Sequence, residues 1–352
     1  MTHENDLMQR LSSIGVNPHP DPDLPPWTEP PAMGEDLAAR MKSLGLEDTR
    51  QDLENNGFAV IRNAFSPEEC DQLMAAVRAC SKLGAAKNIL FKGNPLLFSA
   101  LANKKMMTLA ASFLGPDFLL MQYSSTVLGP GGTGFLPAGV KCFGLHSDQP
   151  ATDPGKSNQT LYTAPRNRNN LLTCCVILSD GYTADTGATY VVPGSHRLRR
   201  FPDVQAITHA EKIAEPILGN RGDIACWDGN VWHAFGVRQI PGERIVMHIS
   251  FAHPEGSEAE DDYDCIPAES FMGTPYQKEL VQLLQRHPET GEILTAHPRR
   301  RRLYWEEASL RLMEWFPKAV GLWLYKKYFD SIVKKELTRV QRAQSENTPP
   351  KA

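Results

Sequence analysis

The chain has 352 residues, of which 41% are hydrophobic and 22% are charged, and these shares are typical of a folded globular protein. Its 37 Lys and Arg against 41 Asp and Glu leave a net charge of −4, which argues against a basic nucleic-acid-binding protein. The seven cysteines are odd in number and contain no C-x-x-C pair, which disfavours a zinc finger or a disulfide scaffold. Neither a signal-peptide pattern nor a long apolar stretch is visible, so we expect no transmembrane segment and a cytoplasmic location.

The N-terminal region, residues 1–50, is predicted to be a Pro-rich arm. Residues 18–31 hold seven of the 27 prolines, too many for a helix or a central strand. From residue 51 the pattern changes. Residues 58–61 alternate as a short strand, and Ser66-Pro67-Glu68-Glu69 forms a capping box that predicts a helix ending near Cys80.

Short strands separated by Gly, Pro, Asp and Asn turns dominate the middle of the chain. The expected strands are 118–128, 140–148, 170–180, 189–194, 222–228, 231–237 and 244–253. With little helix between them, they indicate an antiparallel sandwich or barrel instead of βαβ units. Residues 171–178 are apolar at nearly every position, which predicts a central strand that is buried on both faces.

The remainder is predicted to be a C-terminal helical extension, residues 256–342, followed by a disordered tail, residues 343–352. Residues 299–342 carry 12 Lys and Arg against 5 Asp and Glu and are rich in aromatic side chains. We expect this basic segment to pack on the acidic rest of the molecule. A homodimer contact and a peripheral contact with an anionic membrane are the alternatives.

Three residues have the pattern of a metal site. His146 and Asp148 are two positions apart on an expected strand, so both side chains should point to the same face. His233 lies on another expected strand. Two imidazoles and one carboxylate on one side of an octahedral ion form a facial triad, which leaves three adjacent positions for a bidentate co-substrate and dioxygen.

Arg244 follows His233 across the Pro241-Gly242 turn, and we expect a hairpin to return it beside the metal-binding strand. There its guanidinium could fork onto the distal carboxylate of a dicarboxylic co-substrate, and a surface salt bridge is the alternative. If Arg244 points inward, strand alternation sends Val246 and His248 inward as well.

From about residue 52 to residue 253 the sequence resembles the phytanoyl-CoA dioxygenase family of Fe(II)/2-oxoglutarate oxygenases. The motifs that carry the resemblance are, in chain order, NGFAVIRNAFSPEECDQL, HSD, TGATYVVPGSHR, GDIACWDGNVWHAFGV and Arg244. The resemblance implies a mainly β fold, a cupin-like jelly-roll barrel (double-stranded β-helix) at residues 51–255 with flanking helices. It also implies that His146, Asp148 and His233 bind iron and that Arg244 anchors 2-oxoglutarate.

The resemblance defines the roles of some other residues less clearly. Gln122 stands about where relatives place a polar group beside 2-oxoglutarate, although it could equally be a polar residue on a sheet face. Many relatives place a serine two residues after the distal histidine, whereas this chain has Phe235. We interpret His196, in PGSH, as structural, and the intact Asp148 argues against halogenation.

The predicted function is hydroxylation of an unactivated C–H bond of a small organic substrate. Fe(II) would be the cofactor, and 2-oxoglutarate and O2 the co-substrates, with succinate and CO2 as products. Desaturation, epoxidation and ring closure remain open, as do the substrate's identity and the choice between monomer and homodimer. Two alternatives are an inactive jelly-roll binding module and a His/His/Asp metal-dependent hydrolase, although the hydrolase leaves Arg244 and the PGSH motif unexplained.

Overall fold

The computed structural model describes residues 2–20, 33–80, 85–87, 95–101, 103–115, 118–128, 139–148, 171–179 and 181–253. The helices are α1 (Thr2–Ser13), α2 (Glu35–Ser43), α3 (Glu47–Asn56), α4 (Pro67–Cys80), α5 (Pro95–Leu101), α6 (Lys104–Leu114), η2 (Ser195–Leu198), α7 (Val204–Thr208) and α8 (Ala210–Ile213). The strands are β1 (Phe58–Ile61), β2 (Ala85–Lys87), β3 (Leu119–Leu128), β4 (Cys142–His146), β5 (Leu171–Ile177), β6 (Tyr190–Val191), β7 (Glu215–Pro216), β8 (Ile224–Asp228), β9 (His233–Gly236) and β10 (Arg244–Ala252).

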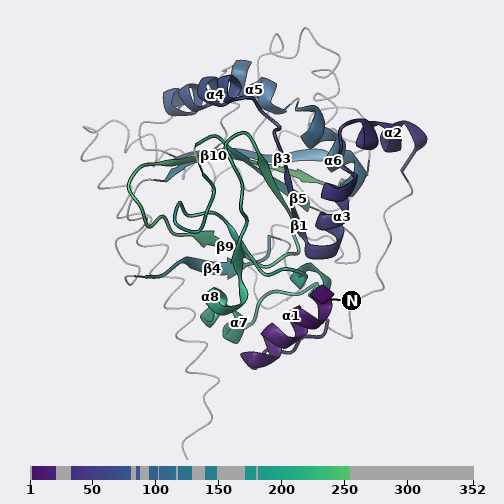
Figure 1. Ribbon diagram of the computed structural model, residues 1–352, viewed down its shortest axis with the longest axis vertical. Coiled ribbons are helices and arrows are strands. Elements are labelled where there is room, and N and C mark those ends of the chain that lie inside the picture. Colours follow the sequence, from purple (N-terminus) through teal and green to yellow (C-terminus); the bar gives the residue numbers. More distant parts are fainter. Residues whose placement is uncertain are drawn as a thin grey trace, which may run out of the picture.

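Two antiparallel sheets face one another as the two halves of a jelly roll. The larger sheet has the order β1-β8-β5-β10-β3-β2, and the smaller has the order β4-β9-β6-β7. In Figure 1 the strands of the larger sheet lie above β4 and β9 of the smaller sheet. The expected antiparallel, mainly β barrel with flanking helices is confirmed.

Alternation along the strands sorts the apolar side chains into three layers. On β10, Ile245, Met247 and Ile249 point outward into the core that the larger sheet shares with helices α2 to α6. Val246 points inward, into the core between the two sheets. The outer face of the smaller sheet packs against α1, α7 and α8, which lie below β4 in Figure 1. Every residue of β5 is buried, which confirms the predicted central strand.

The connection from β9 to β10 crosses between the sheets, so the expected hairpin was wrong. β9 pairs with β4 and β6 in the smaller sheet, whereas β10 pairs with β3 and β5 in the larger one. The turn between β8 and β9 makes the same crossing in the opposite direction. A jelly roll joins its sheets in this way, and consecutive strands therefore face each other across the barrel instead of pairing.

The capping box at the start of α4 is confirmed. The Ser66 amide donates to the Glu69 carboxylate at 2.7 Å, and the Glu69 amide donates to the Ser66 hydroxyl at 3.2 Å. Before β1, the helix α3 ends at Gly57, whose φ of +79° is left-handed. A Cβ at Gly57 would lie 2.5 Å from Nδ1 of His196, so both the turn and the close approach require glycine.

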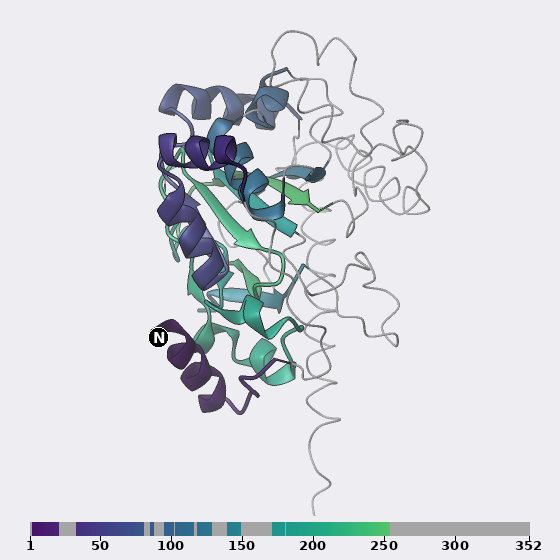
Figure 2. The same cartoon turned by 90° about the vertical axis from the view of Figure 1, so that its right-hand side faces the viewer.

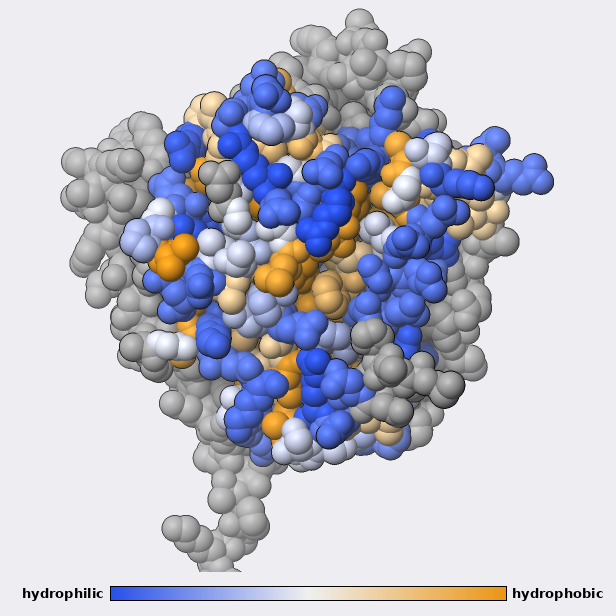
Figure 3. All heavy atoms as spheres, viewed as in Figure 1, coloured by the Kyte–Doolittle hydropathy of each residue, from blue (hydrophilic) through white to orange (hydrophobic). Residues whose placement is uncertain are grey.

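The predicted N-terminal arm contains two helices that the sequence analysis did not foresee, α1 and α2. Leu7 and Leu11 of α1 are buried against the smaller sheet's outer layer, and Met41 of α2 is buried against the larger sheet's helices. Figure 2 shows the purple and dark blue N-terminal helices along one side of the sheets. In Figure 3 the described surface is mostly hydrophilic, with apolar residues gathered in a band across its middle.

Several expectations lie outside the described residues. These are residues 21–31 of the Pro-rich stretch at 18–31, the C-terminal helical extension with its basic aromatic segment, and the tail. Among the described residues, no helix is both long and apolar enough to cross a membrane.

Candidate active site

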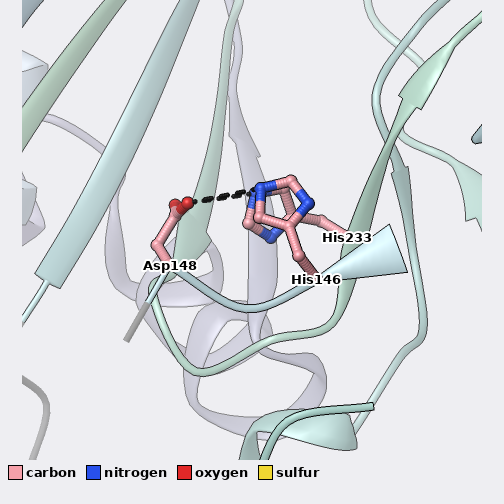
Figure 4. A group of neighbouring side chains, drawn as sticks. All are labelled: His146, Asp148 and His233. Carbon is pink, nitrogen blue, oxygen red and sulfur yellow. Dashed lines mark ion pairs between the residues drawn. The ribbon is translucent and has the colours of Figure 1, made fainter. Parts of the chain in front are cut away.

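His146, Asp148 and His233 converge in the space between the two sheets, and we call them the triad. One ligand atom from each lies within 4.8 Å of the others. Oδ1 of Asp148 is 3.6 Å from Nε2 of His146 and 3.4 Å from Nε2 of His233 (Figure 4). His146 is the last residue of β4 and His233 the first of β9, and the two are direct cross-strand partners. Asp148 lies two residues beyond the end of β4, so the strand is shorter than predicted, but the side chains do meet.

Both imidazole rings are oriented by the backbone. Nδ1 of His146 is 2.6 Å from the Gly144 carbonyl oxygen, and Nδ1 of His233 is 3.1 Å from the Val231 carbonyl oxygen. Because a carbonyl oxygen can only accept a hydrogen bond, each Nδ1 carries the proton. Each Nε2 faces Asp148 and is the ring nitrogen that is available to a metal.

The donor set fits a divalent transition metal. Adjacent ligands of a six-coordinate ion with bonds of about 2.1 Å lie roughly 3 Å apart. The distances of 3.6 and 3.4 Å from Oδ1 of Asp148 to the two histidine Nε2 atoms are close to that spacing. Burial by itself would raise the pKa of Asp148, but the two imidazoles outweigh it and hold that pKa far below its usual range. The carboxylate is therefore ionised and ready to bind a cation.

Two serines fix the segments that carry the triad. The Ser147 hydroxyl, between the first two ligands, donates to the Gly229 carbonyl oxygen at 2.9 Å and so ties the end of β4 to the turn before β9. The Ser195 hydroxyl, in PGSH, accepts from the Trp232 amide at 2.8 Å, immediately before His233. Sequence reasoning missed both roles. The only signal was the position of each serine inside a motif.

His196 holds the PGSH turn against helix α3. Its Nε2 lies 3.1 Å from the Glu54 carbonyl oxygen, so a hydrogen bond joins the turn to the C-terminal end of that helix. Burial lowers the pKa of His196 to about 4. The side chain is 7% exposed, and these contacts support the structural interpretation of this histidine.

Arg244 begins β10 and is buried, with 6% of its surface exposed. Its guanidinium lies 5.8 Å from the ring centroid of Tyr182, close enough for a cation–π contact. Nε and Nη1 have no hydrogen-bond acceptor among the described residues. The pKa of the neighbouring Arg238 is lowered, first by burial and then by the positive charge of Arg244. Two buried guanidinium groups therefore lie near each other, and two donors of Arg244 have no acceptor among the described residues.

Residues on the inner face of the larger sheet form rows across the strands. Gln122 of β3, Ser250 of β10 and Thr173 of β5 occupy one row, and Trp227 of β8 continues it. His248 occupies the next row, and its ring is 6.2 Å from that of Trp227. As predicted, β10 alternation sends Val246 and His248 to the same face as Arg244. Gln122 lies on this face as well.

His248 is neutral at physiological pH. Burial is the main cause that lowers its pKa, to about 4, and the charge of Arg244 adds to it. Its neighbours Trp227 and His233 also contact each other, with ring centroids 5.5 Å apart. A neutral imidazole therefore lies on the inner wall between the triad and Arg244.

Phe235 forms part of the opposite wall. Its ring stacks on His146 with centroids 5.6 Å apart and packs against Phe143 at 5.7 Å. More than half of its surface, 55%, is exposed. An aromatic surface thus borders the triad on the side of the smaller sheet.

Two facing antiparallel sheets with a His-Asp-His group between them define a jelly-roll protein with a candidate metal centre. Residues 53–236, just over half of the chain, match the model of the phytanoyl-CoA dioxygenase (PhyH) family, and the chain belongs to this family. The protein is accordingly a 2-oxoglutarate-dependent dioxygenase, and its His-Asp-His group could hold a metal ion.

Individual relatives are distant. The dioxygenase af480 of Aspergillus fumigatus is 23% identical over 271 residues, which cover 72% of this chain and 80% of that protein. HygX of Streptomyces hygroscopicus, solved with nickel and 2-oxoglutarate bound, has a TM-score of 0.47 and 14% identity, covering 63% of this chain and 93% of HygX. The epimerase SnoN, in complex with Fe3+, alpha ketoglutarate and nogalamycin RO, has a TM-score of 0.46 and 15% identity, covering 72% of this chain and 96% of SnoN.

Proposed function

We propose that the protein hydroxylates an unactivated C–H bond of a small organic substrate. The balanced reaction converts substrate, O2 and 2-oxoglutarate into hydroxylated substrate, succinate and CO2. When bound, Fe(II) supplies the activation of dioxygen that this reaction needs. Within the proposed oxygenase domain, residues 51–255, the protein's own part is to hold the iron, orient both co-substrates and keep the site dry.

The triad is proposed to bind the iron. Oδ1 of Asp148 and the two Nε2 atoms lie within 4.8 Å of one another, and an octahedral ion held by these three atoms would keep three positions for 2-oxoglutarate and dioxygen. This arrangement is the single observation that carries the proposal. Because the carboxylate ligand Asp148 is intact, we propose hydroxylation and not halogenation as the outcome.

Arg244 is proposed to bind the distal carboxylate of 2-oxoglutarate. Two of its buried nitrogens, Nε and Nη1, lack an acceptor among the described residues, and each can donate a charge-assisted hydrogen bond to a carboxylate oxygen. The ring of Tyr182 supports the guanidinium from one side. Gln122, on the same inner face, is proposed to contact the co-substrate as well. The hydroxyl that many relatives place near this carboxylate is replaced by Phe235, so the arginine carries more of the binding.

An anaerobic titration with Fe(II) and 2-oxoglutarate tests this function. The chelate should produce a visible charge-transfer band, and admission of air should then release succinate. A folded protein that forms no band and no succinate would refute the proposal. Replacing Fe(II) by Zn(II) serves as the control, because hydrolytic turnover with zinc and no succinate with iron would favour the metal-dependent hydrolase instead.

The six cysteines within the described residues are all free thiols, which supports a reducing compartment, and we propose the cytoplasm.

A further inference from the structure

Thr173 contacts the oxygen of Asp148 that faces away from the two imidazoles. Its hydroxyl lies 3.4 Å from Oδ2 of Asp148, whereas both histidine Nε2 atoms approach Oδ1. The two carboxylate oxygens therefore have different neighbours. One faces the position of the metal, and the other faces the inner surface of β5.

Ser250 extends this contact into a chain of hydroxyl groups. Thr173 and Ser250 are direct cross-strand partners on β5 and β10, and their hydroxyl oxygens are 3.2 Å apart. Both residues are buried, with 5% and 3% of their surfaces exposed. The pairing of β10 with β3 shifts directly after Ser250, and an irregularity of this kind can re-aim the side chains beside it.

The chemistry of the groups determines the direction of the chain. An ionised carboxylate can only accept, and a threonine hydroxyl has a single proton to donate. Thr173 must therefore donate its proton to Oδ2 of Asp148 and must accept from the Ser250 hydroxyl. Because both hydroxyls are shielded from water, no solvent molecule replaces either bond at low cost.

We propose that Thr173, oriented by Ser250, is a positioning residue that keeps Asp148 monodentate. The inference rests on the proposed function, in which Asp148 binds the metal. A carboxylate that turned to bind through both oxygens would occupy one of the three positions needed by 2-oxoglutarate and dioxygen. A hydrogen bond to Oδ2 holds that oxygen away from the metal, so that only Oδ1 is offered.

Titration with Co(II) alone, without 2-oxoglutarate, tests this role in the full-length protein. Thr173→Val removes the hydroxyl at nearly constant volume, and we expect it to weaken Co(II) binding by about 10- to 100-fold. Thr173→Ser keeps the hydroxyl and should restore most of the affinity. The visible absorption of bound Co(II) should change in the valine variant, because the spectrum reports how many oxygens coordinate.

Ser250 provides an independent check through a double-mutant cycle. Ser250→Ala should cause a smaller loss of Co(II) affinity than Thr173→Val, and it should cause no further loss in the valine background, because Ser250 acts through Thr173. Thr108→Val, at a buried threonine in α6, is the matched control for removing a core hydroxyl. It should leave both the affinity and the spectrum unchanged.

Several results would overturn the proposal. One is a Thr173→Val variant that keeps the native Co(II) affinity and spectrum, and another is a Ser250→Ala loss that adds fully to that of Thr173→Val. Either outcome would show that the hydroxyl chain serves only packing. If instead the native protein itself shows no saturable Co(II) binding, the proposed function fails and this inference fails with it. Circular dichroism of each variant separates these cases from misfolding.

Discussion

Arg244→Ala tests the proposed co-substrate pocket most directly. The native guanidinium is 6% exposed, and both Nε and Nη1 lack an acceptor among the described residues. These donors are already shielded from water in the folded protein. A carboxylate that binds there therefore gains charge-assisted hydrogen bonds without further desolvation of the arginine. Alanine removes these donors while the triad, on other strands, stays in place.

A hydrogen bond to a charged group contributes about 1.5–3 kcal/mol. At 1.36 kcal/mol for each factor of ten, this predicts that the dissociation constant for 2-oxoglutarate rises by about 10- to 150-fold. Arg244→Lys should recover only part of the loss, because an ammonium group cannot reproduce the planar fork. The affinity for the metal alone should not change.

The measurement is anaerobic titration of 2-oxoglutarate into the Fe(II)-loaded protein, followed by the KM for 2-oxoglutarate in air. Arg238→Ala is the comparison, because Arg238 is a neighbouring buried arginine whose Nη2 already donates to the Pro241 carbonyl oxygen at 2.6 Å. We expect it to have the smaller effect. If Arg244→Ala left the affinity unchanged while Arg238→Ala weakened it, the anchor would be Arg238 and the reasoning would be refuted.

Three further predictions concern the metal and the fold. Alanine in place of any triad residue should abolish iron-dependent succinate formation while the circular dichroism spectrum stays native, and full turnover by one of these variants would disprove the site. Burial raises the pKa of Asp228 from 3.8 to about 7, so the folded state keeps a proton that the unfolded state releases, and stability falls as pH rises between about 4 and 7. Asp228→Asn keeps an acceptor for the Asn230 amide and removes the buried charge. At pH 8 it should therefore raise the unfolding free energy, measured by urea titration, by up to about 4 kcal/mol. An equal gain in stability at pH 4 would contradict this explanation. A Cβ at Gly236 would lie 1.8 Å from the Ala188 carbonyl oxygen, so Gly236→Ala should lower the unfolding free energy by about 1–3 kcal/mol or more in the same titrations. Gly34→Ala is the control, because a Cβ there would have no atom within 4 Å, and it should change the unfolding free energy by no more than about 0.5 kcal/mol.

Local patterns were sufficient for most strands of the barrel and for grouping the three triad residues, whereas β2 and β7 were not predicted. Alternation and turn residues predicted β3, β5, β8 and β10 within a few residues of their observed ends, because those signals lie inside the strands themselves. The capping box before α4 is equally local. The triad was recognisable because its residue types and their order along the chain reflect the requirements of the metal.

Sheet pairing could not be inferred in the same way. The Pro241-Gly242 turn has the composition of a hairpin turn, yet the strands on either side of it belong to different sheets. The N-terminal helices were missed for a related reason. Leu7 and Leu11 stabilise α1 only by packing against the outer face of the smaller sheet, and a short helix is marginal without such packing.

The sequence alone thus indicated which residues could form the metal site, because such a site demands particular donor atoms wherever they lie in the chain. Only the tertiary structure decided how those donors are oriented. In the sequence, Thr173 is only a threonine between apolar neighbours on a buried strand. Its contact with Asp148 exists because β5 lies opposite the end of β4 across the barrel. Contacts of this kind join residues far apart in sequence, and their identity depends on which strands face each other, which no local pattern encodes.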